Sequence, residues 1–296
     1  MTVAVAISAE KESHVLPVAT VCLVILVIWY IACVPMNWVV AEGRIAAAGG
    51  GFYNTLAISW NHVRPVIPAP HQIIVELWNS IFMVAPWKVK SLIYHSWITL
   101  SSTVVGFFLG ALLGIGLAIA IVHSKFLSKS LMPWIVASQT IPILAIAPMV
   151  IVVLGAIGFT GLVPKSLISM YLCFFPVTIG MVKGLTSPET MQLDLLRTYH
   201  ASTSQVLWKL RFPASVPFLF ASLKVAVAIA LTGAIVGELP TGAVAGIGAR
   251  LLNGSYYGQT VQIWAALFAA SLVAGALVFG VGVVQRITAR IMGAQP

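Results

Sequence analysis

The stretch that decides the fold is Trp97–Val122, which reads WITLSSTVVGFFLGALLGIGLAIAIV and contains no charged residue. About 20 apolar residues are enough to cross the hydrocarbon core of a bilayer as an α-helix. Gly106, Gly110 and Gly114 recur at every fourth position, and small residues at this spacing let membrane helices approach one another closely. The stretch therefore predicts one span of a packed helical bundle.

The composition of the whole chain supports the same fold class. Of its 296 residues, 60% are hydrophobic and 8% are charged, against roughly 25% charged in soluble domains. With a mean hydropathy of +1.02, too few polar side chains are present to cover a core in water, which excludes a soluble globule. The long unbroken apolar runs exclude a β-barrel. The net charge of +9 indicates basic cytoplasmic loops and not nucleic-acid binding.

Apolar runs of similar length predict about six spans in total. The others are Leu16–Val34, Leu131–Ile157, Ser166–Val182, Val216–Leu239 and Ile263–Val284. The first run is too long for a signal peptide and is expected to remain as an anchor. An even number of spans places both termini on one side, and Lys and Arg are more frequent there, so we expect both termini in the cytoplasm. The prediction is an all-α, multi-pass membrane protein, which the resemblance described below places in the inner (plasma) membrane.

Three segments are expected along the chain. Residues 1–36 form an N-terminal tail and the first span, residues 37–95 form an external segment, and residues 96–296 form the core transmembrane domain with a cytoplasmic loop at 187–213. Within the external segment, His71–Phe82 has apolar residues at helical spacing. This pattern predicts an amphipathic helix at the membrane interface.

The polar insertion 187–213 carries its own folding signals. Ser187, followed by a proline, is expected to cap a first helix. His200 is the predicted turn, and Ser202 with the glutamine three positions later matches a capping box that restarts the helix. Pro213 is expected to end it. The insertion therefore predicts a compact helix-turn-helix.

This insertion resembles the EAA loop found in the membrane subunits of ABC importers. The family pattern is Glu-Ala-Ala, a Gly six positions after the Glu, and Leu-Pro near the end. At the same spacings this chain has Asp194-Leu195-Leu196, His200 and Phe212-Pro213. Two leucines thus replace small alanines, and His200 replaces the glycine. The loop is expected to fold nonetheless, because His tolerates a left-handed turn better than most residues.

Motifs outside the loop resemble the nitrate, sulfonate, taurine and thiamine-precursor branch of this family. They are Ile67-Pro68-Ala69-Pro70, His95-Ser96-Trp97, Ile141-Pro142, Phe174-Phe175-Pro176, Lys183-Gly184, Leu223-Lys224 and Gly237-Glu238-Leu239. The resemblance covers the chain from Ile67 to its C-terminus. It implies a permease subunit with the type-I ABC importer (MetI-like) transmembrane fold. Its solute would be a small anion, such as a sulfonate or nitrate, or a vitamin-precursor heterocycle.

The resemblance also implies partners. Cytoplasmic ABC ATPase subunits would bind the loop, a solute-binding protein would deliver substrate from outside, and a second copy would complete a homodimer in the bilayer. The sequence has no GxxxxGK[ST], so ATP and Mg would be bound by the ATPase, and no cofactor is expected in this chain. By the resemblance, the ATPase-coupling residues are Asp194, Leu195, Leu196, Arg197, His200, Ala201 and Ser202. The alternative is an ordinary capped loop.

Polar and aromatic residues on apolar spans are candidates for the translocation path. They are Gln139, Thr140, Ser169, Tyr171, Phe174, Phe175, Lys224 and Glu238. Prolines near several of them free backbone carbonyls, which is tolerated beside a cavity, although aromatic residues in spans more often serve packing. Lys224 either faces protein, water or an anion, or snorkels to the headgroups. Glu238 is either a gate residue or an interfacial anion.

Two other function classes fit the sequence less well than an importer. A stand-alone secondary transporter would use Lys224 and Glu238 for an ion or proton, but such proteins usually show repeated halves, and the sequence shows no convincing repeat. An intramembrane enzyme would need clustered catalytic groups. The sequence has no HExxH, no GxSxG and no His pair with metal-ligand spacing. We therefore predict neither a catalytic nor a metal site.

Overall fold

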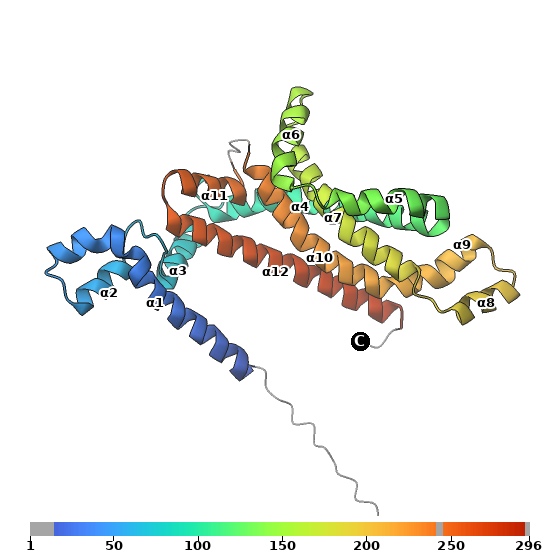
Figure 1. Ribbon diagram of the computed structural model, residues 1–296, viewed down its shortest axis with the longest axis horizontal. Helices are drawn as coiled ribbons and strands as arrows, with labels where there is room; N and C mark the ends of the chain where they lie inside the picture. Colours follow the sequence, from blue (N-terminus) through green and yellow to red (C-terminus); the bar gives the residue numbers. More distant parts are fainter. Residues whose placement is uncertain (1–14, 241–244, 294–296) are drawn as a thin grey trace, which may run out of the picture. The chain divides into compact units, whose positions relative to one another are not determined.

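The computed structural model describes residues 15–240 and 245–293, and the regular elements in these ranges are all helices (Figure 1). The chain divides into two compact units, one up to Glu76 and one from Leu77 onward. The division falls within one helix, Pro70–Trp78.

The first unit is built around a long helix and the segment that follows it. Its elements are α1 (Val15–Ala47), α2 (Phe52–Trp60) and the first part of α3 (Pro70–Trp78). The buried side chain of Asn37 donates to the carbonyls of Ser59 and Ile67 at 3.0 and 2.9 Å. Its Oδ1 accepts from the N–H of Val66 at 2.8 Å. Because both ends of this buried amide are satisfied, Asn37 fixes α1 to α2 and to the segment between α2 and α3.

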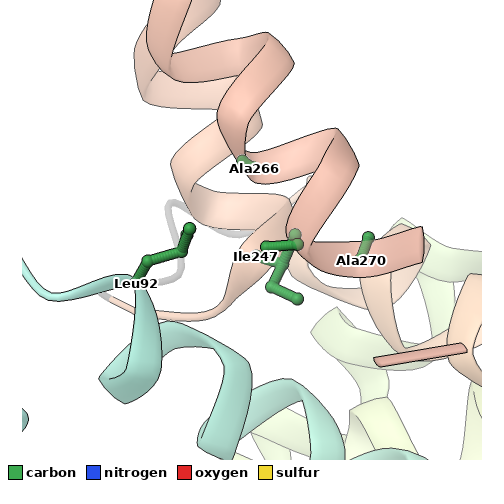
Figure 2. Packing of buried hydrophobic residues seen from close by; sticks show 5 residues of the cluster. Leu92, Ile247, Ala266 and Ala270 are labelled. Atoms are coloured by element: carbon green, nitrogen blue, oxygen red, sulfur yellow. The ribbon is translucent and has the colours of Figure 1, made fainter. Parts of the chain in front are cut away.

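The second unit contains the remaining helices. They are η1 (Asn79–Met83), α4 (Leu92–His123), α5 (Lys125–Ser138), α6 (Ile143–Ala156), α7 (Leu162–Leu185), α8 (Thr190–Thr198), α9 (Thr203–Val206), η2 (Leu207–Arg211), α10 (Phe212–Glu238), α11 (Ile247–Tyr256) and α12 (Thr260–Ile291). Helices α4, α7 and α10 pack against one another at the centre, and α12 packs against α10, α11 and α4. Figure 2 shows Leu92, Ile247, Ala266 and Ala270 meeting where α4, α11 and α12 come together.

The contact between α4 and α7 depends on the predicted glycine stripe. A Cβ added at Gly106 would lie 2.5 Å from the Cβ of Ser169, and one added at Gly114 would lie 2.8 Å from the carbonyl oxygen of Phe174. At Gly110 the added atom would collide with the sulfur of Cys173. The stripe therefore lets the two backbones approach closely, as the spacing predicts.

Five helical segments are long and apolar enough to span a membrane, among the residues that the structure describes. They are α1, α4, α7, the continuous segment Thr203–Glu238 and α12, and the bent pair α5 and α6 counts as a sixth if it is one span. The expected span Leu131–Ile157 is not one continuous helix, because the chain bends by 98° between Ser138 and Ile143. Pro142 lies at this break, where its ring and missing N–H prevent helix continuation.

The helix expected to end at Pro213 instead continues. Thr203–Glu238 is one element of 36 residues, in which α9, η2 and α10 follow one another without interruption. The π-helical turn Leu207–Arg211 ends two residues before Pro213. A π-turn changes the hydrogen-bond register, so the missing N–H of the proline is accommodated at the junction.

Candidate functional site

In the loop between α7 and α10, the N-terminus of α8 is capped by hydrogen bonds within the loop. Glu189 is the N-cap of α8, and its backbone N–H donates to the side chain of Gln192 at 3.2 Å as part of a capping box. The expected cap at Ser187 is wrong, because its hydroxyl donates to the carbonyl of Gly184 at 2.7 Å and so ends α7 instead. Helix α8 therefore begins two residues later than the sequence indicated.

The turn of this loop has the predicted left-handed residue. His200 has φ 51°, and it is the non-glycine residue with positive φ in the described part of the chain. Its N–H donates to the carbonyl of Arg197 at 2.9 Å, and the N–H of Ala201 donates to the carbonyl of Leu196 at 3.0 Å. These two bonds form a Schellman motif, which satisfies the last carbonyls of α8.

The second helix of the loop begins with the predicted capping box. The hydroxyl of Ser202 accepts from the N–H of Gln205 at 3.3 Å, and the side chain of Gln205 accepts from the N–H of Ser202 at 2.8 Å. Both ends of the turn are thus hydrogen-bonded within the loop. The loop needs no other protein to satisfy its backbone at these positions.

The surface of α8 is apolar along one side. Met191, Leu195 and Tyr199 lie four positions apart and are 80%, 58% and 76% exposed. Residues at this spacing share one face of a helix, so the three side chains form a continuous stripe. Beside the stripe, Arg197 pairs with Asp194 at 2.8 Å, and both side chains are exposed. An exposed apolar stripe with a charged border is typical of a protein contact surface.

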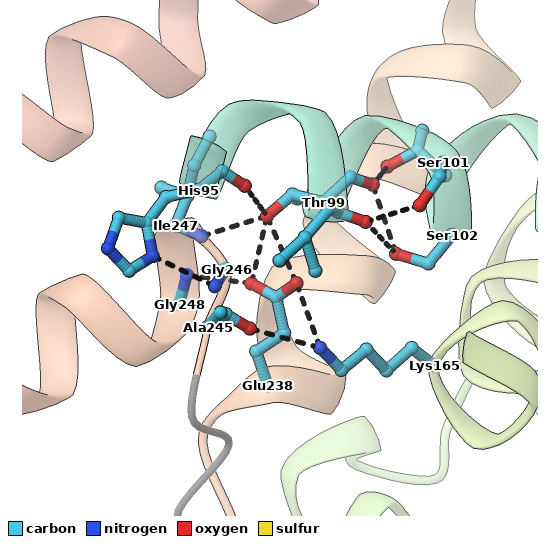
Figure 3. A network of polar contacts seen from close by, with 12 residues as sticks. His95, Thr99, Ser101, Ser102, Lys165, Glu238, Ala245, Gly246, Ile247 and Gly248 are labelled. Atoms are coloured by element: carbon cyan, nitrogen blue, oxygen red, sulfur yellow. Dashed lines mark hydrogen bonds and ion pairs between the residues drawn. The ribbon is translucent and has the colours of Figure 1, made fainter. Parts of the chain in front are cut away.

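A second polar site lies at the opposite end of α10, around Glu238. This carboxylate is fully buried. The hydroxyl of Thr99 on α4 lies 3.0 Å from both of its oxygens, and the ammonium of Lys165 on α7 lies 3.4 Å from Oε1. Figure 3 shows these groups converging from three helices. Because a buried charge is tolerated only when it is paired and hydrogen-bonded, the carboxylate ties α4, α7 and α10 together.

The beginning of α11 completes this network through its backbone. The N–H of Gly248 donates to Glu238 Oε2 at 2.8 Å, and the N–H of Ile247 donates to the hydroxyl of Thr99 at 2.8 Å. Gly246 has φ 132°, and an added Cβ there would collide with the Glu238 carboxylate. A Cβ added at Gly248 would lie 2.8 Å from that of Glu238. Both glycines are therefore required by close approach to the carboxylate.

The network extends to a buried histidine. Nδ1 of His95 accepts from the N–H of Gly246 at 3.0 Å, so Nε2 carries the ring hydrogen and donates to the carbonyl of Val89 at 2.7 Å. Lys165 makes a further bond to the carbonyl of Ala245 at 3.2 Å. Gly246 and Ala245, directly before α11, are thus anchored on α4 and α7 respectively.

The candidate path residues fall into two groups. Gln139 and Thr140 are exposed at the break between α5 and α6, and the hydroxyl of Tyr171 donates to the carbonyl of Ser138 at 2.6 Å beside that break. Tyr171 also borders a cavity of about 500 Å³ that is otherwise lined by apolar side chains of α6 and α7. These three residues are therefore near one another, in a region that remains a candidate for the path.

The other group is involved in helix packing. Ser169 is buried and donates to the carbonyl of Ala230 at 2.6 Å, which joins α7 to α10. Phe174 is buried in a cluster with Ile121, and Phe175 packs against the same cluster. The role of these residues in transport remains a prediction.

Lys224 lies in the middle of the long helix and far from Glu238. The two residues are 14 positions apart in α10, which is about 21 Å at the usual helical rise. The Lys224 side chain lies against α12, where its Cε would be 3.8 Å from a Cβ added at Gly282. Among the described residues, the two ion pairs are Lys165–Glu238 and Asp194–Arg197, so Lys224 belongs to neither.

Sequence reasoning missed the partners of Glu238. Lys165 and Thr99 are separated from it by 73 and 139 positions, so no local pattern joins them. One signal was available, since a carboxylate in an apolar span requires a cation, and Lys165 begins the span on the same side. No group of three or more His, Cys, Asp or Glu side chains that could hold a metal ion occurs within 15–240 and 245–293.

Comparison with known proteins gives a family for this architecture. Residues 106–293 match the model of the binding-protein-dependent transport system inner membrane component. A probable ABC transporter permease protein of Haemophilus influenzae is 31% identical over 202 residues, which cover 68% of this chain and 77% of that protein. A riboflavin transport system permease protein of Chloroflexus aurantiacus is 29% identical over 76% of this chain and 80% of its own length.

A third relative extends the range of named solutes. A putative aliphatic sulfonates transport permease protein of Bacillus subtilis is 27% identical over 70% of this chain and 71% of its own length. The family model covers well over half of the chain, including the loop with α8 and α9, the long helix and, of the Glu238 network, Lys165, Glu238 and the start of α11. The chain therefore belongs to the family of binding-protein-dependent transport system inner membrane components, the permease subunits of ABC importers.

Proposed function

We propose that loop 187–213 is the coupling element of this permease and that the solute is a small organic anion. Family membership means that the chain is a multi-pass inner membrane protein working with an ATPase and a solute-binding protein, and that ATP is bound by the ATPase. The observation that carries the proposal is the exposed stripe of Met191, Leu195 and Tyr199 on a helix whose ends are satisfied within the loop.

The loop is built to move as one body. The Schellman turn at His200 and the capping box at Ser202 hold α8 and α9 in a fixed arrangement. The guanidinium of Arg211 donates to the carbonyl of Leu185 at 2.8 Å, which joins the end of the loop to α7. A displacement of the loop by closure of the ATPase pair would therefore pass into α7 and along α10, because rigid elements transmit a shift that flexible ones absorb.

Transmission of this movement to the membrane helices would produce alternating access. ATP binding closes the ATPase subunits, the loops of two permease copies approach, and the path opens outward; hydrolysis reverses the change. Contacts are assigned to Asp194, Leu195, Leu196, Arg197, His200, Ala201 and Ser202. All but Leu196 and Ala201 are exposed.

The homodimer and the orientation of the chain are parts of the same proposal. Helix α6 exposes large apolar side chains, among them Leu144, Met149 and Val152. A second copy would cover this face together with lipid. The basic residues at the α8 end of the bundle support a cytoplasmic position for this end and for both termini. The solute-binding protein would then bind at the Glu238 end.

The choice of an anion rests on Lys224. A cation in the middle of a span is costly unless it faces protein, water or an anion, and no described carboxylate pairs with it. The relatives named for aliphatic sulfonates and for riboflavin give the two solute classes to compare. We assign the path to the region of Gln139, Thr140 and Tyr171 together with Lys224.

The test is co-purification followed by transport. The tagged chain is co-expressed with the ATPase and binding protein encoded beside it, and the ATPase that is retained in mild detergent is quantified. Leu195→Glu places a charge on the stripe and should remove the ATPase. Thr190→Glu adds the same charge to the first turn of α8, off the stripe, and should retain it.

Uptake into proteoliposomes then separates the solutes and the rival function. We expect ATP-dependent uptake of radiolabelled ethanesulfonate, reduced by Lys224→Met, and no uptake of riboflavin. Uptake of riboflavin alone would contradict the anion assignment. Uptake by the chain without ATPase and ATP would instead show a stand-alone secondary transporter.

A further inference from the structure

A second pocket, distinct from the α6–α7 cavity, lies where α4, α5, α7 and η2 meet. Its volume is about 360 Å³. Three cationic side chains line it, Lys125 and Lys129 from α5 and Arg211 from η2. The hydroxyl-bearing Ser128 and Thr186 also border it, and isoleucine and valine side chains of α4 and α7 complete the wall. The pocket is thus cationic on one side and apolar on the other.

The charges around this pocket are unbalanced. None of its lining residues carries a carboxylate. Lys125 and Lys129 lie four positions apart on α5, where like charges repel each other, and α5 has no acidic residue in its first turn. Cations at the N-terminal end of a helix also oppose its dipole. Residues that destabilise their own helix are expected at functional positions. Here an anion in the pocket would offset the repulsion between Lys125 and Lys129 and their unfavourable interaction with the helix dipole.

Arg211 supplies the third positive charge of the pocket, and a hydrogen bond fixes the position of its guanidinium. One N–H of its guanidinium donates to the carbonyl of Leu185 at 2.8 Å, and the side chain is partly buried. The guanidinium is therefore held at the wall of the pocket by α7. Arg and Lys together are the side chains that most often recognise phosphate, Arg through directed N–H donors and Lys as a point charge.

We propose that this pocket binds a phosphate group, supplied by the headgroup of an anionic lipid or by a free phosphate. The apolar wall favours the lipid, since the glycerol and upper acyl chain would lie against the residues of α4 and α7 while the phosphate meets the three cations. Basic pockets between membrane helices take anionic headgroups in this way. The bound group would join α5 to η2, the turn that leads from the loop into α10.

The experiment uses native mass spectrometry of the full chain in complex with its ATPase, exchanged into defined lipid. The probes are phosphatidylglycerol, phosphatidylcholine and inorganic phosphate. The wild type should retain phosphatidylglycerol and not phosphatidylcholine, whose choline cation cancels the charge. Lys125→Gln with Lys129→Gln should lower retained phosphatidylglycerol about tenfold or more. Both lysines are exposed, and gel filtration confirms that the variant remains folded.

The matched control removes the same number of charges outside the pocket. Lys183→Gln with Lys209→Gln changes exposed lysines of α7 and η2 that do not line it, and should retain the lipid as the wild type does. Competition by millimolar inorganic phosphate that requires Lys125 and Lys129 would support a site for free phosphate. Absence of competition would support the lipid headgroup. Equal retention by the pocket variant, equal loss in the control or equal binding of phosphatidylcholine would overturn the proposal.

Discussion

The two ends of the long helix Thr203–Glu238 satisfy their polar groups in opposite ways. At the Glu238 end, a buried carboxylate takes its partners from α4, α7 and the start of α11 (Figure 3). At the other end, the turn between α8 and α9 takes its hydrogen bonds from within the loop, and α8 exposes apolar side chains. The first end is completed by the chain's own tertiary structure. The second satisfies the ends of its helices locally and leaves apolar side chains exposed, which we propose as the coupling surface.

Glu238→Ala is expected to have the largest effect on stability. The change leaves the Lys165 ammonium buried without its carboxylate, and the N–H of Gly248 loses its acceptor. Removing one partner of a buried pair typically costs about 3–5 kcal/mol. We therefore expect a large fall of the thermal unfolding midpoint in detergent, with low yield.

A double variant shows whether the pair itself is responsible. Glu238→Ala with Lys165→Met removes both charges, so it should be more stable than the sum of the single changes indicates. Strict additivity of the two losses, or an unchanged midpoint in Glu238→Ala, would contradict the assignment of this network as the anchor of the Glu238 end.

Gly248→Ala tests the close approach at the same end. The added Cβ would lie 2.8 Å from the Cβ of Glu238, so the backbone must move. Overpacking of this kind costs about 1–3 kcal/mol and should lower the unfolding midpoint. Gly116→Ala in α4 is the control, because nothing lies within 4 Å of its added Cβ. Equal midpoints for the two variants would show that α11 is not held tightly against α10.

Ser202→Ala tests whether the loop end is a local structural unit. The loss of the N-cap hydroxyl should destabilise the start of α9 by about 1 kcal/mol and leave the rest of the bundle unchanged. Hydrogen exchange should therefore accelerate at residues 203–206 while the global midpoint stays constant. Ser204→Ala, an exposed position at the second residue of α9, should show neither effect. A global loss of stability in Ser202→Ala would mean that the loop is not an independent local unit.

His200 gives the smallest expected effect. Its φ of 51° is a conformation that Gly adopts freely, so His200→Gly should stabilise the turn by at most about 1 kcal/mol. His200→Val, with a β-branched side chain, should destabilise it. Exchange rates of the Ala201 amide measure both changes. Faster exchange in His200→Gly than in the wild type would contradict the left-handed turn.

The same comparison explains what could be predicted from the sequence. The glycine stripe of α4, the capping box at Ser202 and the turn at His200 are local patterns, and the structure confirms each of them. The helix end expected at Pro213 was wrong, because the π-turn before the proline accommodates its missing N–H and the helix continues. The span expected at Leu131–Ile157 is broken at Pro142 into α5 and α6.

The Glu238 network could not be predicted in the same way. Its members come from four helices, and the bond between Ile247 and Thr99 joins residues 148 positions apart. Such pairs depend on how the helices pack, which periodicity and capping signals do not specify. The loop could be read locally because its hydrogen bonds are local, whereas the buried end required the tertiary structure.

The most direct test of the coupling surface is site-specific photo-crosslinking at two matched tyrosines. Tyr199 on α8 is 76% exposed and Tyr256 at the end of α11 is 77% exposed. Each is replaced by p-benzoylphenylalanine in the assembled transporter, and adducts are identified by mass spectrometry. We predict that position 199 captures the ATPase subunit and that position 256 does not. An ATPase adduct at position 256 but not at 199, or at neither position, would contradict the account.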